Sequence, residues 1–250
     1  GLYLAEAYGL LHDQLNPELL KRIAFEVDRR ILKPYLEQND IFWLYNAVGE
    51  DGEPQLVNNW NAVCNAGVIG AAVYLERDDW RLSAILAKAI LSLSDYLDTF
   101  DSDGGSEEGP GYWDYGFGYY ALAGHLLERC TAGKITLFQD ELIPKIACYP
   151  LKTLLSPGCY VNFSDAHERF EFTRPLLVFL SERLDIPGLK SLALHSPEGT
   201  GRHDFTWSLR DLFWREKELE TVPFLPAEHD WFSQMMWMIA RSDPVDPDGL

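Results

Sequence analysis

The chain has 250 residues, of which 47% are hydrophobic and 13% aromatic, a composition typical of a folded globular protein rather than a disordered one. Its 39 acidic and 21 basic residues give a formal net charge of −18, which repels nucleic acids and anionic membranes. The longest apolar stretches, such as AVCNAGVIGAAVYL at residues 62–75, are shorter than the roughly 20 residues that a membrane-spanning helix needs. We therefore expect neither a nucleic acid nor a membrane as partner.

Helical periodicity dominates the first hundred residues. Asn16 and Pro17 form a helix start, with Asn as N-cap and Pro at the first helical position. Asp79 is expected to cap a long helix, and a loop rich in Gly and Asp at 49–54 interrupts the pattern. The predicted helices cover residues 2–14, 17–36, a segment that begins at about residue 60, and 79–97.

The second half of the chain continues the helical pattern after a long Gly-rich loop, TFDSDGGSEEGPG at 99–111. Strand signals are weak until residues 231–240, which resemble a first strand of a following β domain. Helix after helix without βαβ alternation predicts an all-α domain, although periodicity alone does not distinguish a toroid from a bundle. The predicted helices here are 113–130, 140–148, 170–184, 189–195 and 204–213.

The four cysteines show no CxxC pairing, and we expect them to be buried free thiols, although the sequence leaves disulfides open. No HExxH motif, cysteine pair or histidine cluster indicates a metal site in this chain. We therefore expect no cofactor in this segment. The cysteines are Cys64, Cys130, Cys148 and Cys159.

Two segments contain the residues that we expect to form a functional site. The first, VNNWNAVCNAG at 57–67, places two amides, Asn58 and Asn59, and then Trp60 at the start of a helix. Amide donors beside a helix N-terminus suit a carboxylate, because the helix end adds partial positive charge. The second, EEGPGYWDYGFGYY at 107–120, is a loop-to-helix passage crowded with tyrosines.

Together these segments resemble the helical domain of heparinase II/III-like polysaccharide lyases and related alginate lyases. In that family an Asn- or His-containing segment followed by Trp, and a later EG-x-x-Y-x-x-Y-like segment, line one groove of an incomplete (α/α) toroid. Asn58 and Tyr115 are 57 positions apart here, which is compatible with the family. The segments YVNFSD at 160–165 and RSDPVDPDGL at 241–250 extend the resemblance, the latter to the junction with a β-sandwich domain.

The resemblance implies a toroid domain over residues 1–228 and the start of a C-terminal β domain over 229–250. The chain opens already in helical phase and ends without a capping element, so we expect it to be part of a larger protein. In the family the β-sandwich supplies further catalytic histidine and metal-associated groups. Whether this chain acts without that domain therefore stays open at this point.

The implied reaction is β-elimination between C4 and C5 of a uronic-acid-containing glycan. It must stabilise an enolate-like dianion, for which preorganised donors are suited. We assign Asn58 and Asn59 to the carboxylate and Tyr115 as acid or base, with Tyr112 and Tyr119 as alternatives for that tyrosine. Substrate binding is assigned to Trp60, Glu108, Tyr112, Trp113, Tyr119, His167 and Arg174.

Two other functions stay open from the sequence. Glu107, Glu108 and Asp114 would suit a toroid glycoside hydrolase, whose two carboxyl groups lie roughly 5 to 9.5 Å apart. Alternatively, the domain binds glycans without turnover. The expected partner is an acidic polysaccharide or oligosaccharide, and the resemblance implies a bacterial periplasmic or secreted location.

Overall fold

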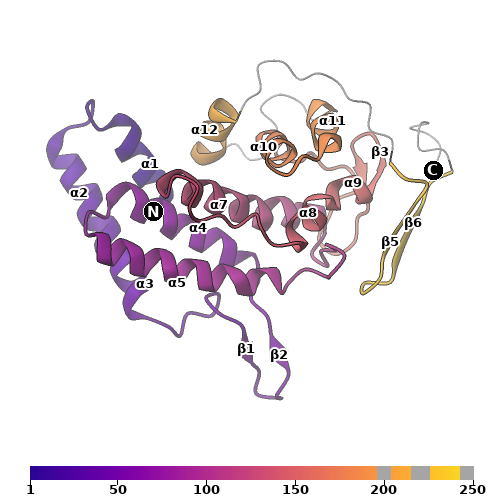
Figure 1. The fold of residues 1–250 in the computed structure, drawn as a ribbon, viewed down its shortest axis with the longest axis horizontal. Helices are drawn as coiled ribbons and strands as arrows, with labels where there is room; N and C mark the ends of the chain where they lie inside the picture. The colour runs from indigo at the N-terminus through magenta and orange to yellow at the C-terminus, as the bar shows by residue number, and fades with distance from the viewer. Residues whose placement is uncertain (196–203, 215–225, 243–250) are drawn as a thin grey trace. The chain divides into compact units, whose positions relative to one another are not determined.

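The computed structural model describes residues 1–195, 204–214 and 226–242. Within these ranges the chain is mostly helical, and its strands form three separate two-stranded antiparallel sheets. This confirms the prediction of an all-α class (Figure 1). The chain divides into two compact units, one made of residues 1–99 and 119–137 and the other of residues 100–118 and 138–250.

The first unit begins with α1 (Leu2–Leu11), followed by α2 (Pro17–Val27). Asn16 caps α2 as predicted, since its side chain accepts a hydrogen bond of 2.8 Å from the Glu18 backbone N–H. The helix predicted over 17–36 is not uniform. It passes through a π turn, η1 (Asp28–Leu32), before it ends as α3 (Lys33–Glu37).

Helix α4 (Asn59–Leu75) packs against α1 and against α5 (Asp79–Leu97), which has the predicted bounds. Small residues allow α1 to approach closely: a Cβ added at Gly70 would lie 2.2 Å from Cδ1 of Leu2. The N-cap of α5 is Asp78, whose side chain accepts a 2.8 Å hydrogen bond from the Arg81 N–H. The prediction of Asp79 as the cap was wrong by one residue.

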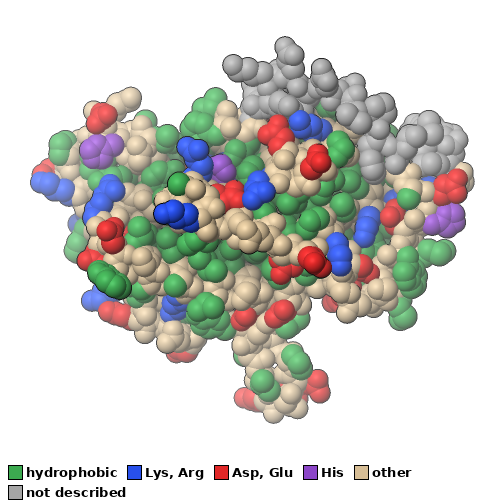
Figure 2. All heavy atoms as spheres, viewed as in Figure 1, with side chains coloured by type: hydrophobic (Ala, Val, Ile, Leu, Met, Phe, Trp, Pro, Cys, Tyr) green, Lys and Arg blue, Asp and Glu red, His purple; other side chains and the backbone are tan. Residues whose placement is uncertain are grey.

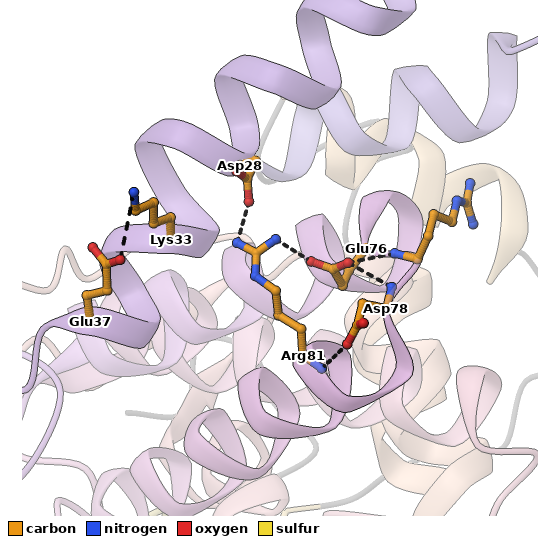
Figure 3. Close-up of polar contacts among 7 residues, drawn as sticks. Asp28, Lys33, Glu37, Glu76, Asp78 and Arg81 are labelled. Carbon is orange, nitrogen blue, oxygen red and sulfur yellow. Dashed lines mark hydrogen bonds and ion pairs between the residues drawn. The ribbon is translucent and has the colours of Figure 1, made fainter.

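Arg81 joins three helical segments of this unit (Figure 3). Its guanidinium donates to Asp28 at the start of η1 and to Glu76 at the end of α4, the latter at 2.6 Å. Glu76 Oε1 also accepts from the backbone N–H of Asp78 at 2.9 Å. The turn between α4 and α5 is thereby tied to the π turn.

A short hairpin, β1 (Ala47–Val48) and β2 (Pro54–Gln55), leads into α4. Its base is fixed by Asn46, which accepts from the Val57 N–H at 2.9 Å and contacts Asp95 and Asp98 of the α5 end at 2.8 Å each. The sequence predicted a loop here. In the space-filling view the protruding hairpin carries acidic and apolar side chains (Figure 2).

Helix α7 (Gly118–Cys130) completes the first unit from residue 119 onward. Tyr120 lies with its ring centroid 6.1 Å from that of Tyr96 in α5, and Leu126 lies near Gly70 of α4. Ala132, just beyond the helix, has a positive φ of 50°.

Among the described helices of the second unit, none is longer than the 11 residues of α10. The unit begins with the loop from Phe100 and continues through a helical passage with a π turn, and a hairpin is the last element in its described part. The elements are α6 (Gly109–Tyr112), η2 (Trp113–Phe117), α8 (Leu142–Ala147), α9 (Tyr149–Thr153), β3 (Leu154–Ser156), β4 (Cys159–Tyr160), α10 (Arg174–Leu184), α11 (Pro187–His195), α12 (Phe205–Phe213), β5 (His229–Phe232) and β6 (Trp237–Ala240).

The hairpin of β5 and β6 lies where the sequence suggested a first strand. Arg241, which follows β6, is buried. Its guanidinium donates to the carbonyl oxygens of Leu154, Ala227 and Lys152 at 2.6 to 2.7 Å and pairs with Asp230 at 2.7 Å. The hairpin is thus attached to β3 and α9 through one side chain.

All four cysteines are free thiols, as expected, but their predicted burial is only partly correct. Cys130 is exposed, and the other three are half-buried. Burial raises the pKa of the Cys64 thiol to about 11.

Among the helices in the described part of the chain, none combines the length and apolar character that a membrane crossing requires.

Candidate functional site

The N-terminus of α4 presents the first group of predicted residues. Asn58 is its N-cap, and the side-chain oxygen accepts a 3.0 Å hydrogen bond from the Trp60 N–H. The Asn58 Oδ1 atom caps the helix, and the Nδ2 group of the same amide is the hydrogen-bond donor. The Asn58 side chain is exposed. Trp60 is 53% exposed. An amide donor, a helix end and an aromatic ring therefore adjoin on a helix of 17 residues.

Asn59 occupies a different environment from Asn58. It is buried, and its Oδ1 accepts a hydrogen bond of 3.3 Å from the Tyr96 hydroxyl. The sequence treated the two amides as equivalent. The structure assigns Asn58 to the surface of α4 and Asn59 to its packing with α5.

A buried amide network further along α4 was missed by the sequence analysis. Asn61 Nδ2 lies 3.0 to 3.1 Å from the carbonyl oxygens of Trp43, Leu44 and Ser92. Asn65 donates to the Ser92 hydroxyl at 2.8 Å and accepts from the Tyr35 hydroxyl at 2.7 Å. The four-residue spacing of the two amides beside alanines was the available signal, since it places both on one buried helix face.

The tyrosine segment forms the second group and lies across α6 and η2. Gly109 begins it with φ of +84°, and a Cβ there would lie 2.8 Å from the Phe163 carbonyl oxygen, so only glycine fits. Tyr112 is 39% exposed, and Tyr115 is half-buried within the π turn. Single π turns interrupt helices frequently at functional sites, and no pattern in the sequence indicated this one.

Trp113 was predicted to offer a ring face to a sugar, and its burial contradicts that role. The ring is fully buried against Phe117, Tyr149 and Phe172, with centroid distances of 5.4, 6.5 and 5.4 Å. Its indole N–H donates to the Ile146 carbonyl oxygen at 2.8 Å. Trp113 is therefore a core residue of the second unit.

Asp114 is also buried, and its carboxylate is used structurally. One oxygen accepts from the Thr173 N–H at 2.8 Å and the other from the Thr173 hydroxyl at 2.7 Å. These bonds join η2 to the start of α10. A carboxyl group held in this way is poorly suited to be the acid or base of a hydrolase.

The remaining predicted residues are distributed over both units. Tyr119 is buried in the first unit. In the second unit Glu108 and His167 are exposed, whereas Arg174 is half-buried at the first position of α10. Glu107, the other carboxylate of the hydrolase alternative, is exposed as well.

Charge is concentrated in the loop before the tyrosine segment. Burial, followed by the nearby charges of Asp103 and Glu107, raises the pKa of Asp101. Burial also acts to raise the pKa of Asp103, but hydrogen bonds from Ser233 and Gly105 outweigh it, and the pKa of Asp103 is lowered. Elsewhere burial raises the pKa of the buried Tyr149 phenol.

No group of three or more His, Cys, Asp or Glu side chains is arranged to hold a metal ion within the ranges that the structure describes. Lys and Arg side chains are interspersed with Asp and Glu on the face that Figure 2 shows.

In comparisons with known proteins, no family model matches the sequence. No curated protein matches it either.

Proposed function

We propose that this chain is the helical domain of a polysaccharide lyase that cleaves uronic-acid-containing glycans by β-elimination. The proposal includes an incomplete (α/α) toroid as its finer architecture. The observation that carries it is the N-terminus of α4, where the exposed Asn58 cap and the exposed Trp60 stand together. The likeness of the segments at 57–67 and 107–120 to heparinase II/III-like lyases supports it.

The α4 end has the chemistry that a uronate requires. In the elimination a base removes the C5 proton, the C5–H electron pair forms the C4–C5 double bond, and the C4 oxygen leaves with a proton. Negative charge grows on the adjacent carboxylate during this step, and a fixed donor there contributes a few kcal/mol, roughly 3 to 4 in measured cases. In this proposal the Asn58 amide and the partial positive charge of α4 supply that stabilisation, and Trp60 contacts a sugar ring.

The proton transfers are assigned to the tyrosine segment. Tyr115 is the first candidate because it occupies the second tyrosine position of the EG-x-x-Y-x-x-Y-like segment and stands on the π turn. Tyr112 is the alternative, and its exposure makes it accessible to a ligand. Tyr119 and Asn59, which are buried, are assigned to structure rather than to the reaction.

Hydrolysis is less well supported than elimination. It requires two carboxyl groups, and Asp114 is occupied by Thr173. Glu107 and Glu108 are adjacent and both exposed. The proposed partner is an acidic polysaccharide, and the proposed location is the bacterial periplasm or the cell exterior.

The test is ultraviolet absorbance of the unsaturated uronate during incubation with a panel of uronic-acid polysaccharides. Asn58→Asp is the sharpest variant, because aspartate keeps the cap of α4 but replaces the amide donor with a negative charge. We expect it to lose activity by about a hundredfold or more with its melting temperature unchanged. Tyr115→Phe should abolish turnover, with Tyr3→Phe, an exposed tyrosine of α1, as the matched control.

Three results would contradict the proposal. New reducing ends without absorbance would indicate hydrolysis and move the assignment to Glu107 and Glu108. Binding of the glycan without either product would indicate a binding module. Unchanged rates in both Asn58→Asp and Tyr115→Phe would remove these residues from the reaction.

A further inference from the structure

The loop that precedes the tyrosine segment is fastened to the C-terminal hairpin, and Asp103 is the centre of this attachment. Its Oδ2 accepts hydrogen bonds from the backbone N–H and the hydroxyl of Ser233, at 2.7 and 2.9 Å. Its Oδ1 accepts from the Gly105 N–H at 3.1 Å. Its carbonyl oxygen accepts from Nζ of Lys152 at 3.0 Å. One residue thus contacts its own loop, helix α9 and the turn of the hairpin β5–β6.

Neighbouring residues complete the attachment. The Ser102 N–H donates to Oε1 of Gln234 at 2.8 Å, and the Ser102 carbonyl accepts from Lys145 at 2.9 Å. Gly104 has φ of +84°, and a Cβ there would lie 2.3 Å from the Lys145 carbonyl. The Lys152 ammonium also lies 5.3 Å from the ring centroid of Phe232 in β5. The loop is therefore closely seated against α8, α9 and the hairpin.

The same loop sets where the tyrosine segment begins. The Ser106 carbonyl oxygen accepts from the Tyr149 hydroxyl and from the Gly109 N–H, both at 3.2 Å. Gly109 is the first residue of α6, which carries Tyr112 and runs directly into η2 with Tyr115. Only five residues separate Asp103 from Gly109 in the chain. A displacement of Asp103 would therefore move the start of α6, because the chain between them is short.

We propose that Asp103 is a positioning residue, through which the hairpin β5–β6 holds the start of α6 and with it the orientation of Tyr112 and Tyr115. This inference rests on the proposed lyase function for its catalytic consequence, but the attachment itself does not. The hydrogen bonds from Ser233 join segments 130 positions apart. They lie at the surface, so their loss should release the loop without opening the core of the second unit.

The experiment is hydrogen exchange measured by mass spectrometry on the full chain. Asp103→Ala removes both side-chain acceptors, and Ser233→Ala removes one hydroxyl donor while it leaves the backbone bond. Asp165→Asn, at an exposed position of the same unit, is the control. We expect Asp103→Ala to raise exchange in peptides covering 104–117 and 229–240 by roughly tenfold or more, the size of effect that hydrogen bonds to a charged group produce. Exchange in α10 should stay unchanged.

Kinetics supplies the second readout. If lyase activity is present, Asp103→Ala should lower kcat while KM changes little, because the variant disturbs the reacting tyrosines and leaves the α4 end intact. Unchanged exchange in 104–117 would overturn the positioning role, as would a change confined to the hairpin. Raised exchange together with an inactive wild-type chain would uphold the attachment and reject the lyase function. If Asp103→Ala does not fold, Ser233→Ala carries the same comparison with a smaller expected rise.

Discussion

Asn61 provides the most direct test of how the first unit is held together. Its side chain is completely buried, and one amide nitrogen serves carbonyl oxygens from the segment after α3 and from α5. Asn61→Ala removes about two net hydrogen bonds, worth about 1 kcal/mol each. It also leaves a buried acceptor unsatisfied, which adds about 1 kcal/mol. This penalty is at the low end of the usual range, because the Leu44 carbonyl oxygen still accepts a hydrogen bond from the Ser92 hydroxyl. The expected loss is therefore about 3 kcal/mol of unfolding free energy.

The measurement is urea-induced unfolding followed by circular dichroism. Asn58→Asp is the matched control on the same helix, because an exposed N-cap tolerates aspartate, and we expect a change within about 0.5 kcal/mol. A loss below about 1 kcal/mol for Asn61→Ala would refute the reasoning, since the network would then contribute no more than a surface contact.

A second substitution at this position separates hydrogen bonding from packing. Asn61→Asp keeps the shape of the side chain but turns the carbonyl-facing donor into an acceptor. The folded state then favours the protonated acid, so the pKa of the new carboxyl is raised above its unfolded value. The stability of this variant relative to the wild type is therefore greatest below the unfolded pKa of the new carboxyl and is lost as the pH rises through the folded-state pKa. A variant whose unfolding free energy tracked the wild type across pH would contradict this account.

Three further predictions concern the hairpin, a helix end and an ion cluster. Arg241→Lys should destabilise the hairpin β5–β6 by about 2 kcal/mol, because one ammonium group cannot reach all the carbonyl oxygens that the three guanidinium nitrogens contact. Hairpin amides that stay as protected from hydrogen exchange as in the wild type would disprove this. Ala132→Gly should stabilise the first unit by about 1 kcal/mol in thermal melting, since φ at this position is 50°. The pKa of Glu26 is lowered to about 2 by hydrogen bonds from Arg29 and Arg30. Its contribution is present above the unfolded pKa near 4.5 and is lost as the pH falls through about 2, so Glu26→Gln should flatten acid unfolding in this window.

The helices that the sequence predicts well are those with local signals at their ends. The segment 79–97 has a long apolar stripe and a polar start, and α5 has these bounds. Asn16 and Pro17 likewise identify the start of α2, because the cap and the fixed φ act within a single turn. The two-residue strands of the hairpin at 47–55 were missed, since so short a pairing depends on the contacts of Asn46 with α5 rather than on any strand pattern.

The candidate site was predictable to the extent that its residues are governed by local structure. Asn58 was expected at a helix start and is found there. Trp113 was misassigned to substrate binding because it lies within the tyrosine-rich segment, whereas its burial is decided by Tyr149 and Phe172, which lie far along the chain. Phe117 four residues later was the one local sign, because a Trp and a Phe at this spacing share a helix face.

The sequence left three tyrosines as alternatives because a single sequence does not fix the register of the motif. In a regular helix the spacings of three and seven place Tyr112, Tyr115 and Tyr119 on one face, so periodicity cannot separate them. A π turn contains an additional residue in its i→i+5 ring, which alters the phase of everything after it by about 100°. The exposed Tyr112, half-buried Tyr115 and buried Tyr119 agree with such an interruption. Residues far along the chain contact this passage: the Asp114 carboxylate accepts hydrogen bonds from Thr173, and Gly109 lies against the Phe163 carbonyl oxygen. Sequence reading could not supply these contacts.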